Sequence, residues 1–432
     1  MDDAARSGTS KAFRRLTGFL ILCYVFSYLD RINIGFANLT MAKDLHLSAT
    51  MFGMANSIFY VAYALFEIPS NLALARYGAK VWIPRIMITW GVCSCLTALA
   101  WDQYSLYALR FLVGAAEAGL FPGVILYLSY WFGSRQRARA NAIFVIGMPL
   151  ALLIGSPLSG FILQMHGLGG LAGWKWLFLI EGLPSIVMGI AAWFYLADRP
   201  SKAKWLTDDE KAAMEATVAA ENAVDAGGHT GAFRWKDLLN LPVMLLAFAY
   251  FCGIASNNTI STWTPLVVKE MLGNTDDTLL IGIIGAIAPV FAILAIPLWS
   301  RSSDLRNERR YHVAATLSLA AAGWLVIIFA SAPAVKLAGL VCASVGGFCF
   351  IALFWTLATP LLAPASRPAG IGLISTAGLM ASIVSPGVVG ALRDLTHSYH
   401  AGFWYNTVLL IAGIGALLFA TLRKPSQQGQ TA

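Results

Sequence analysis

The chain has 432 residues, of which 58% are hydrophobic and only 12% are charged, and its mean hydropathy is +0.67. These values exclude a large soluble catalytic domain and predict an all-α integral membrane protein. The net charge of +8 does not indicate a nucleic-acid binder, because the basic residues are scattered between apolar segments and form no dense patch.

Apolar windows long enough to cross a bilayer recur along the whole sequence. The first follows a polar, basic N-terminus and has no small-residue cleavage site near its end, so we expect a retained helix and not a signal peptide. Twelve spans are predicted, at about 16–38, 51–75, 82–101, 104–131, 138–163, 176–197, 241–263, 278–299, 312–331, 337–361, 369–392 and 402–422.

The basic residues are distributed unequally between the two sides of these spans. Alternating the sides gives 23 Lys and Arg residues on the side of the N-terminus and 5 on the other. Because basic loops stay in the cytoplasm, this asymmetry predicts a multi-pass protein of a bacterial-type inner membrane with both termini cytoplasmic.

A polar stretch at 198–240 divides the chain into two six-helix halves, 1–197 and 241–432. In this linker, Thr207 to Glu210 matches a capping box and predicts a short surface helix, which the flexible segment 226–231 follows. The halves resemble each other weakly: Gly155-Ser-Pro157 in the fifth span is matched by Val384-Ser-Pro386 in the eleventh. Such a repeat is typical of secondary transporters, whose substrate site lies near the bilayer midplane between the halves.

Six charged side chains fall inside the predicted spans, where each must face a cavity or a partner. Buried carboxyl groups can exchange protons, which makes Asp30 and Glu117 the candidates for proton coupling. A guanidinium group fits a carboxylate, so Arg31 and Arg110 are the candidates for anion binding. Arg110 and Glu117 are seven residues apart and share one helix face. Two of the six, Glu67 and Glu181, are interpreted as structural.

The second half has no charge inside its spans, so the site would be asymmetric. Its neutral candidates include Asn258, Trp355 and Ser375, and Tyr28 and Tyr63 are candidate hydrogen-bond donors in the first half. Alternatively, the membrane charges could only tie helices together. A membrane enzyme is disfavoured because the six histidines lie in loops or at span ends and no nucleophile or metal cluster is visible; no cofactor or metal is expected.

Several motifs together resemble the anion:cation symporter family of the major facilitator superfamily. The resemblance covers nearly the whole chain and rests on four segments and on Trp131-Phe with the basic residues Arg135 to Arg139 after it. The four segments are Tyr28-Leu-Asp-Arg-Ile-Asn-Ile-Gly-Phe-Ala37, Glu67-Ile-Pro-Ser-Asn71, Arg110-Phe-Leu-Val-Gly-Ala-Ala-Glu-Ala-Gly-Leu-Phe-Pro-Gly123 and Trp174-Lys-Trp-Leu-Phe-Leu-Ile-Glu-Gly-Leu-Pro184.

The resemblance implies proton-coupled import of a small organic anion, with protonatable roles for Asp30 and Glu117 and substrate contacts for Arg31 and Arg110. We also expect a monomer embedded in lipid. Members that carry sugar acids have a glutamine where this chain has Met148, and an Asn-containing stretch where it has Ser375. These departures, with the added aromatic surface of Phe354, disfavour an aldonate such as galactonate. The first-span segment Tyr28 to Ala37 resembles the branch of the family that includes tartrate, phthalate and 4-hydroxyphenylacetate carriers, which implies an aromatic acid or a hydroxy-dicarboxylate such as tartrate, phthalate or hydroxyphenylacetate. An aldonate symporter, a proton-driven exporter and an anion exchanger on the same fold are the alternatives.

Overall fold

The computed structural model describes residues 3–227, 239–362 and 366–422, and within these ranges the regular structure is helical throughout. Eleven of its helical stretches are long and apolar enough to cross a membrane, and Gly147–Leu163 is a shorter apolar helix. The predicted all-α membrane architecture is therefore confirmed. The chain forms two compact units, one of residues 1–46 and 58–229 and one of residues 47–57 and 230–432.

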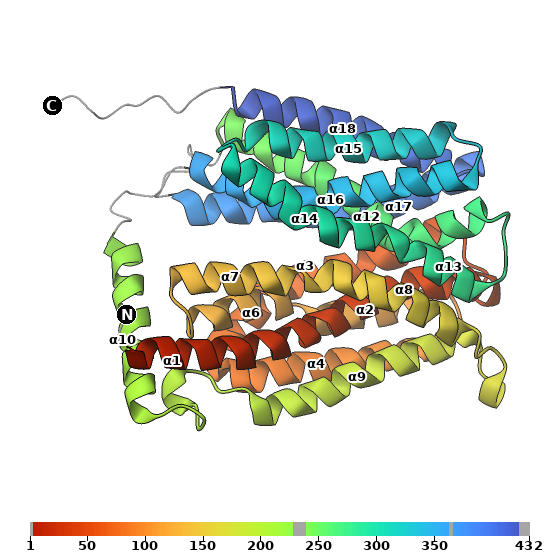
Figure 1. Ribbon diagram of the computed structural model, residues 1–432. Helices are drawn as coiled ribbons and strands as arrows, with labels where there is room; N and C mark the ends of the chain where they lie inside the picture. Colours follow the sequence, from red (N-terminus) through yellow and green to blue (C-terminus); the bar gives the residue numbers. More distant parts are fainter. Residues whose placement is uncertain (1–2, 228–238, 363–365, 423–432) are drawn as a thin grey trace. The chain divides into compact units, whose positions relative to one another are not determined.

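The first unit begins with one long helical rod, in which α1 runs through a short π-helical turn into α2 (Figure 1). α2 packs against α8 and α9, and α4 packs along α9. The helices of this part of the chain are α1 (Asp3–Ala12), α2 (Gly18–Asp44), α3 (Ala49–Tyr77), α4 (Ala79–Leu96), α5 (Gln103–Glu117), α6 (Leu120–Ser129), α7 (Ser134–Val145), α8 (Gly147–Leu163), α9 (Gly173–Tyr195) and α10 (Asp208–Gly227).

The second unit is built around α12, which contacts α16, α17 and α18. The first residues of α3 belong to this unit, where the Asp394 carboxylate accepts hydrogen bonds from the backbone N–H groups of Ala49 and Thr50. The other helices are α12 (Leu241–Met271), α13 (Thr278–Gly285), α14 (Ile287–Leu305), α15 (Arg310–Phe329), α16 (Pro333–Leu361), α17 (Arg367–Thr396) and α18 (His400–Ala420).

Three predicted spans are each divided into two helices. The fourth is interrupted at Gly119, which has a left-handed φ of +88°, and the fifth at Ile146. The eighth divides at Ala286, between α13 and α14. Hydropathy cannot reveal such breaks, because the residues on both sides of each are apolar.

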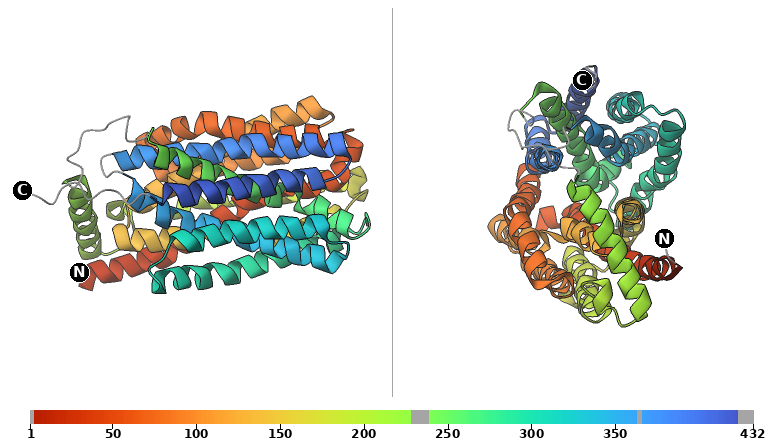
Figure 2. Two further views of the ribbon diagram at one scale, coloured as in Figure 1. Left: turned by 90° about the horizontal axis from the view of Figure 1, so that it is seen from above. Right: turned by 90° about the vertical axis from the view of Figure 1, so that its left-hand side faces the viewer.

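The predicted surface helix of the linker is present as α10, which lies across the end of the first unit where α1 begins (Figure 1, Figure 2). Its predicted capping box is formed: the Glu210 backbone N–H donates to Thr207 Oγ1, and the Thr207 N–H donates to Glu210 Oε2. Glu210 also accepts hydrogen bonds from Ser7 and Lys11 of α1, each at 2.7 Å. Most of the segment predicted to be flexible, at 226–231, lies outside the described residues.

Candidate functional site

A buried ion pair joins two of the predicted site residues in the first unit. Arg31 Nε lies 2.7 Å from Glu117 Oε1, and Ser27 Oγ donates to the same oxygen at 2.7 Å. Ser27 and Arg31 are four residues apart and therefore share a face of α2. Glu117 is the last residue of α5 and its side chain is fully buried, with no partner for Oε2 among the described residues. This pair connects a candidate anion binder directly to a candidate proton carrier.

Aromatic rings surround the Arg31 guanidinium group. Its central carbon lies 5.6 Å from the ring centroid of Tyr28, 5.8 Å from that of Phe59 and 5.1 Å from that of Tyr63. Ring faces attract a cation at these distances and exclude water from it. The structure thus brings together Tyr28, Arg31, Tyr63 and Glu117. Phe59 was missed, because an apolar residue in an apolar span carries no distinguishing signal.

Arg110 is also buried, with 2% of its surface exposed, but its surroundings differ. Its guanidinium carbon lies 4.6 Å from the Phe59 ring centroid, and it makes no hydrogen bond or ion pair with any residue that the structure describes. A buried cation without an acceptor is costly, and a carboxylate that reached it would relieve that cost. Arg110 therefore meets the chemical requirement for an anion-binding group.

Asp30 points to a different group of side chains from its neighbour Arg31. Its carboxylate accepts hydrogen bonds from the Trp90 indole N–H, from Ser94 at 2.8 Å, from Ser185 at 3.1 Å and from the Asn33 amide at 3.2 Å. All of these donors are neutral, and Asp30 has no cationic partner in the described part of the chain. The donors on α4 and α9 are 60 or more residues away in sequence, so the sequence could not assign them.

The two acids interpreted as structural also differ from each other. Glu67 is partly exposed on α3 and close enough to Arg31 to interact with it electrostatically. Glu181 has only 2% of its surface exposed, and its Oε1 accepts a hydrogen bond from Ser159 at 2.7 Å.

Three of the four predicted residues of the second unit belong to two groups of side chains. Phe354 and Trp355 pack against Tyr250, with ring centroids at 4.7 Å and 5.2 Å, so Tyr250 adds a third ring that the sequence did not single out. Asn258 donates to Ser382 Oγ at 2.8 Å. Ser375 is exposed on α17.

Met148, on α8 of the first unit, is half-buried. Within the described ranges, no three His, Cys, Asp or Glu side chains lie together as metal ligands would.

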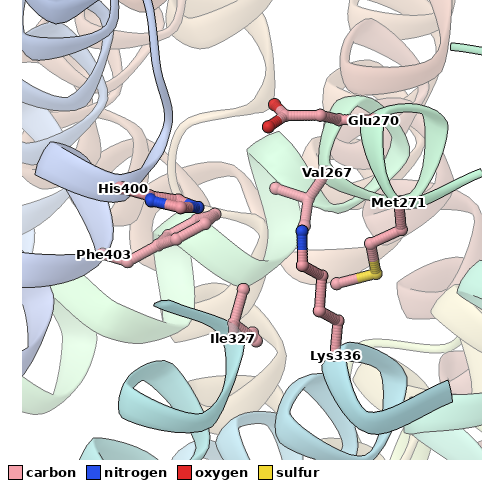
Figure 3. Close-up of a pocket in the computed structure, with 7 residues that line it drawn as sticks. All are labelled: Val267, Glu270, Met271, Ile327, Lys336, His400 and Phe403. Carbon is pink, nitrogen blue, oxygen red and sulfur yellow. The ribbon is translucent and has the colours of Figure 1, made fainter. Parts of the chain in front are cut away.

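One pocket lies in the second unit, where α12 and α15 end and α16 and α18 begin (Figure 3). None of the predicted site residues lines it. Its lining is Val267, Glu270, Met271, Ile327, Lys336, His400 and Phe403.

Comparison with known proteins identifies the family. The model of the Major Facilitator Superfamily matches residues 20–365 and 277–432, which together include most of the chain. The chain belongs to the major facilitator superfamily. It is therefore a multi-pass membrane transporter, as the sequence motifs predicted, and not an enzyme.

Individual relatives of this superfamily member match it over nearly its full length. A putative tartrate transporter of Agrobacterium vitis is 41% identical, with 97% of this chain and 95% of the relative covered. The putative metabolite transport protein NicT of Pseudomonas putida is 37% identical, with 95% and 94% covered. These relatives confirm the prediction, made from the sequence motifs, that the chain is a transporter of the anion:cation symporter type.

A solved structure shows the same superfamily fold at low sequence identity. It is a bacterial homologue of the human lysosomal transporter Spinster, with a TM-score of 0.75, 15% identity and 97% of each chain covered. This likeness concerns the fold alone.

Proposed function

We propose that this chain is a proton-coupled symporter that imports a small organic carboxylate by alternating access. The observation that carries the proposal is Arg110, a buried guanidinium group without a described acceptor in the same unit as the Arg31–Glu117 ion pair. A substrate carboxylate would supply the acceptor that Arg110 lacks. Fixed cationic groups of this kind distinguish an anion carrier from a carrier of neutral sugars.

The Arg31–Glu117 pair supplies a mechanism for coupling. While Glu117 is ionised, it occupies Arg31 through the 2.7 Å contact. Protonation of Glu117 removes that charge and frees Arg31 to bind a second substrate oxygen or carboxylate. Proton uptake and anion binding would then favour one another, as linkage requires. Asp30, held by neutral donors, would be the second proton carrier.

The proposed substrate class, a small organic acid, is supported by the relatives and by the side chains of the candidate site. The relatives named for tartrate and for metabolite transport favour an organic acid. The cluster of Tyr250, Phe354 and Trp355, together with Met148 in place of an amide, favours an aromatic acid or a compact hydroxy-dicarboxylate over a long polyol acid.

We further propose that the protein is a monomer in a bacterial-type inner membrane with both termini in the cytoplasm. The excess of Lys and Arg residues on the side of the N-terminus supports the orientation of the termini.

Ligand binding by Arg110 variants tests the proposal. Purified protein is heated with tartrate, phthalate, hydroxyphenylacetate or galactonate, since a ligand at about 100 times its Kd stabilises a protein by about 2.7 kcal/mol. We expect tartrate, phthalate or hydroxyphenylacetate to raise the midpoint temperature of unfolding, and Arg110→Gln to abolish that shift. Arg110→Lys should retain part of the shift, because lysine keeps the positive charge but lacks the paired N–H donors of the guanidinium group.

Arg85→Gln is the matched control, since Arg85 stacks on Trp82 of α4 outside this cluster. An Arg110→Gln protein that binds the anion as tightly as the unaltered chain would contradict the proposed site.

A further inference from the structure

Two buried groups of opposite charge remain unpaired on the same helix. Arg110 Nε has no acceptor and Glu117 Oε2 has no donor among the residues that the structure describes. The two residues are seven positions apart, so both project from one face of α5. Glu117 is close enough to Arg110 to interact with it electrostatically. Because an unpaired buried charge is costly, a specific feature of the fold is needed to keep these two groups apart.

The ring of Phe59 on α3 is the feature that contacts Arg110. The guanidinium carbon of Arg110 lies 4.6 Å from the centroid of this ring. A ring face attracts a guanidinium group most strongly where water is excluded, and the exposed fractions of Arg110 and Phe59 are only 2% and 1%. The ring stabilises Arg110 without neutralising its positive charge. An anion can therefore still bind to the guanidinium group.

Gly114 explains why the ring lies beside Arg110. Gly114 follows Arg110 by four residues, so it lies on the same face of α5, one turn further along. A Cβ atom at Gly114 would overlap the carbonyl oxygen of Phe59, so the missing side chain allows the backbone of α3 to approach α5 at this point. The rings of Tyr60 and Tyr63 pack against the Phe59 ring, with centroids at 5.0 Å and 6.2 Å, and restrict its movement.

Glu117 is the acceptor that Arg110 would reach if the ring were removed. The other charged groups that interact electrostatically with Arg110 are Asp30 and Arg31. The Asp30 carboxylate already accepts hydrogen bonds from four neutral donors, and Arg31 is itself a cation. Glu117 Oε1 is bonded to Arg31 and Ser27, but Glu117 Oε2 is open.

We infer that Phe59 is a positioning residue whose ring holds the Arg110 guanidinium group away from Glu117 and so keeps Arg110 available to a substrate anion. The inference rests on the proposed function, in which Arg110 binds the anion. Without the ring, Arg110 would pair with Glu117 Oε2, and the substrate would compete with an internal carboxylate. Phe59 therefore acts on the anion through Arg110 and not by direct contact.

A double-mutant cycle of Phe59→Leu and Glu117→Gln tests this role, because Glu117→Gln removes the competing charge. The dissociation constant is measured by titration calorimetry with whichever of tartrate, phthalate and hydroxyphenylacetate binds the unaltered protein. We expect Phe59→Leu alone to weaken binding roughly tenfold. In the Glu117→Gln background, the same substitution should change the dissociation constant by about twofold or less.

Three further variants complete the design. Phe59→Tyr keeps the ring face and should bind the anion as the unaltered protein does. Phe66→Leu is the matched control, since Phe66 lies on the same helix, packs against Phe111 and has no cation–π contact in the described part of the chain. Phe59→Met, which also lacks a ring, takes the place of Phe59→Leu if the leucine variant does not fold.

Two results of the cycle would overturn the inference. An equal loss of affinity from Phe59→Leu in both backgrounds would show that the ring acts by packing alone. Unchanged affinity of Phe59→Leu in the presence of Glu117 would show that the ring does not hold Arg110 away from it.

Binding by Arg110→Gln separates this inference from the proposed function. If Arg110→Gln abolishes binding and the cycle is additive, the proposed site stands and the inference on Phe59 fails. If Arg110→Gln binds the anion as tightly as the unaltered protein, both the proposed site and the inference on Phe59 fail.

Discussion

Arg31 and Arg110 are two guanidinium groups of the first unit that share the Phe59 ring, but only Arg31 has a carboxylate partner among the described residues. We therefore propose different roles for the two residues: Arg31 responds to the protonation of Glu117, whereas Arg110 binds the substrate anion. Residues of identical chemistry therefore acquire separate proposed roles from a single contact.

Gly114 controls how closely the helix that carries Arg110 and Glu117 approaches α3. A Cβ atom at Gly114 would overlap the carbonyl oxygen of Phe59, which belongs to the backbone and cannot move aside. Gly114→Ala should separate α5 from α3 at a cost of roughly 1–3 kcal/mol and weaken anion binding. Thermal unfolding with and without substrate measures both effects.

Gly18→Ala is the control, since nothing lies within 4 Å of a Cβ there. Equal stability and affinity of the two variants would show that the contact between α5 and α3 is unimportant.

The sequence singled out the charged residues of the proposed site but not the side chains that contact them. Asp30, Arg31, Arg110 and Glu117 stand out because charge is rare in an apolar span. Trp90 and Ser185, which donate to Asp30, do not stand out in the sequence, because a buried Trp or Ser has many possible neighbours. The direction in which adjacent Asp30 and Arg31 point depends on packing between helices, which no local pattern encodes.

Among the helices, the features that the sequence predicted are those with a local sequence signal. Hydropathy predicted where the helices lie, whereas the breaks at Gly119, Ile146 and Ala286 depend on backbone geometry within uniformly apolar stretches. The capping box of α10 was predicted because its signal is local. The contact of α10 with α1 was not predicted, because it joins residues about 200 positions apart in the sequence.

The contact between α1 and α10 should persist in moderate acid. The hydrogen bond from Lys11, followed by those from Ser7 and Thr207, lowers the pKa of Glu210 to about 2. A depressed pKa contributes stability that is present above the unfolded value of about 4.3 and is lost as the pH falls through the folded value. Protection of the α10 amides from hydrogen exchange should therefore survive at pH 5 and decline only toward pH 2.

Replacement of Glu210 provides the matching variant. Glu210→Ala should cost about 1 kcal/mol locally and speed exchange in the first turn of α10 by roughly fivefold. Asp209→Ala, at an exposed position in the same turn, should have a smaller effect. Equal exchange in both variants would show that the contact with α1 does not hold α10.

For the whole molecule, composition and repeated apolar windows were sufficient to predict a helical membrane protein, because the bilayer imposes a length and a polarity on every span. The family motifs then indicated the class of transport. The predicted site residues of the two units differ in chemistry: all the charged ones lie in the first unit, while those of the second are aromatic or neutral polar. We propose that proton coupling depends on the first unit and that the second unit shapes the substrate preference.

The most direct test of proton coupling is uptake by Glu117→Gln in proteoliposomes with an imposed proton gradient. If net charge enters with the substrate, 100 mV contributes about 2.3 kcal/mol per charge, enough for roughly fiftyfold accumulation by the unaltered protein. Glutamine cannot exchange a proton, so we expect Glu117→Gln to lose uphill accumulation and to retain substrate counterflow. Proton-driven accumulation by Glu117→Gln equal to that of the unaltered protein would contradict the coupling mechanism.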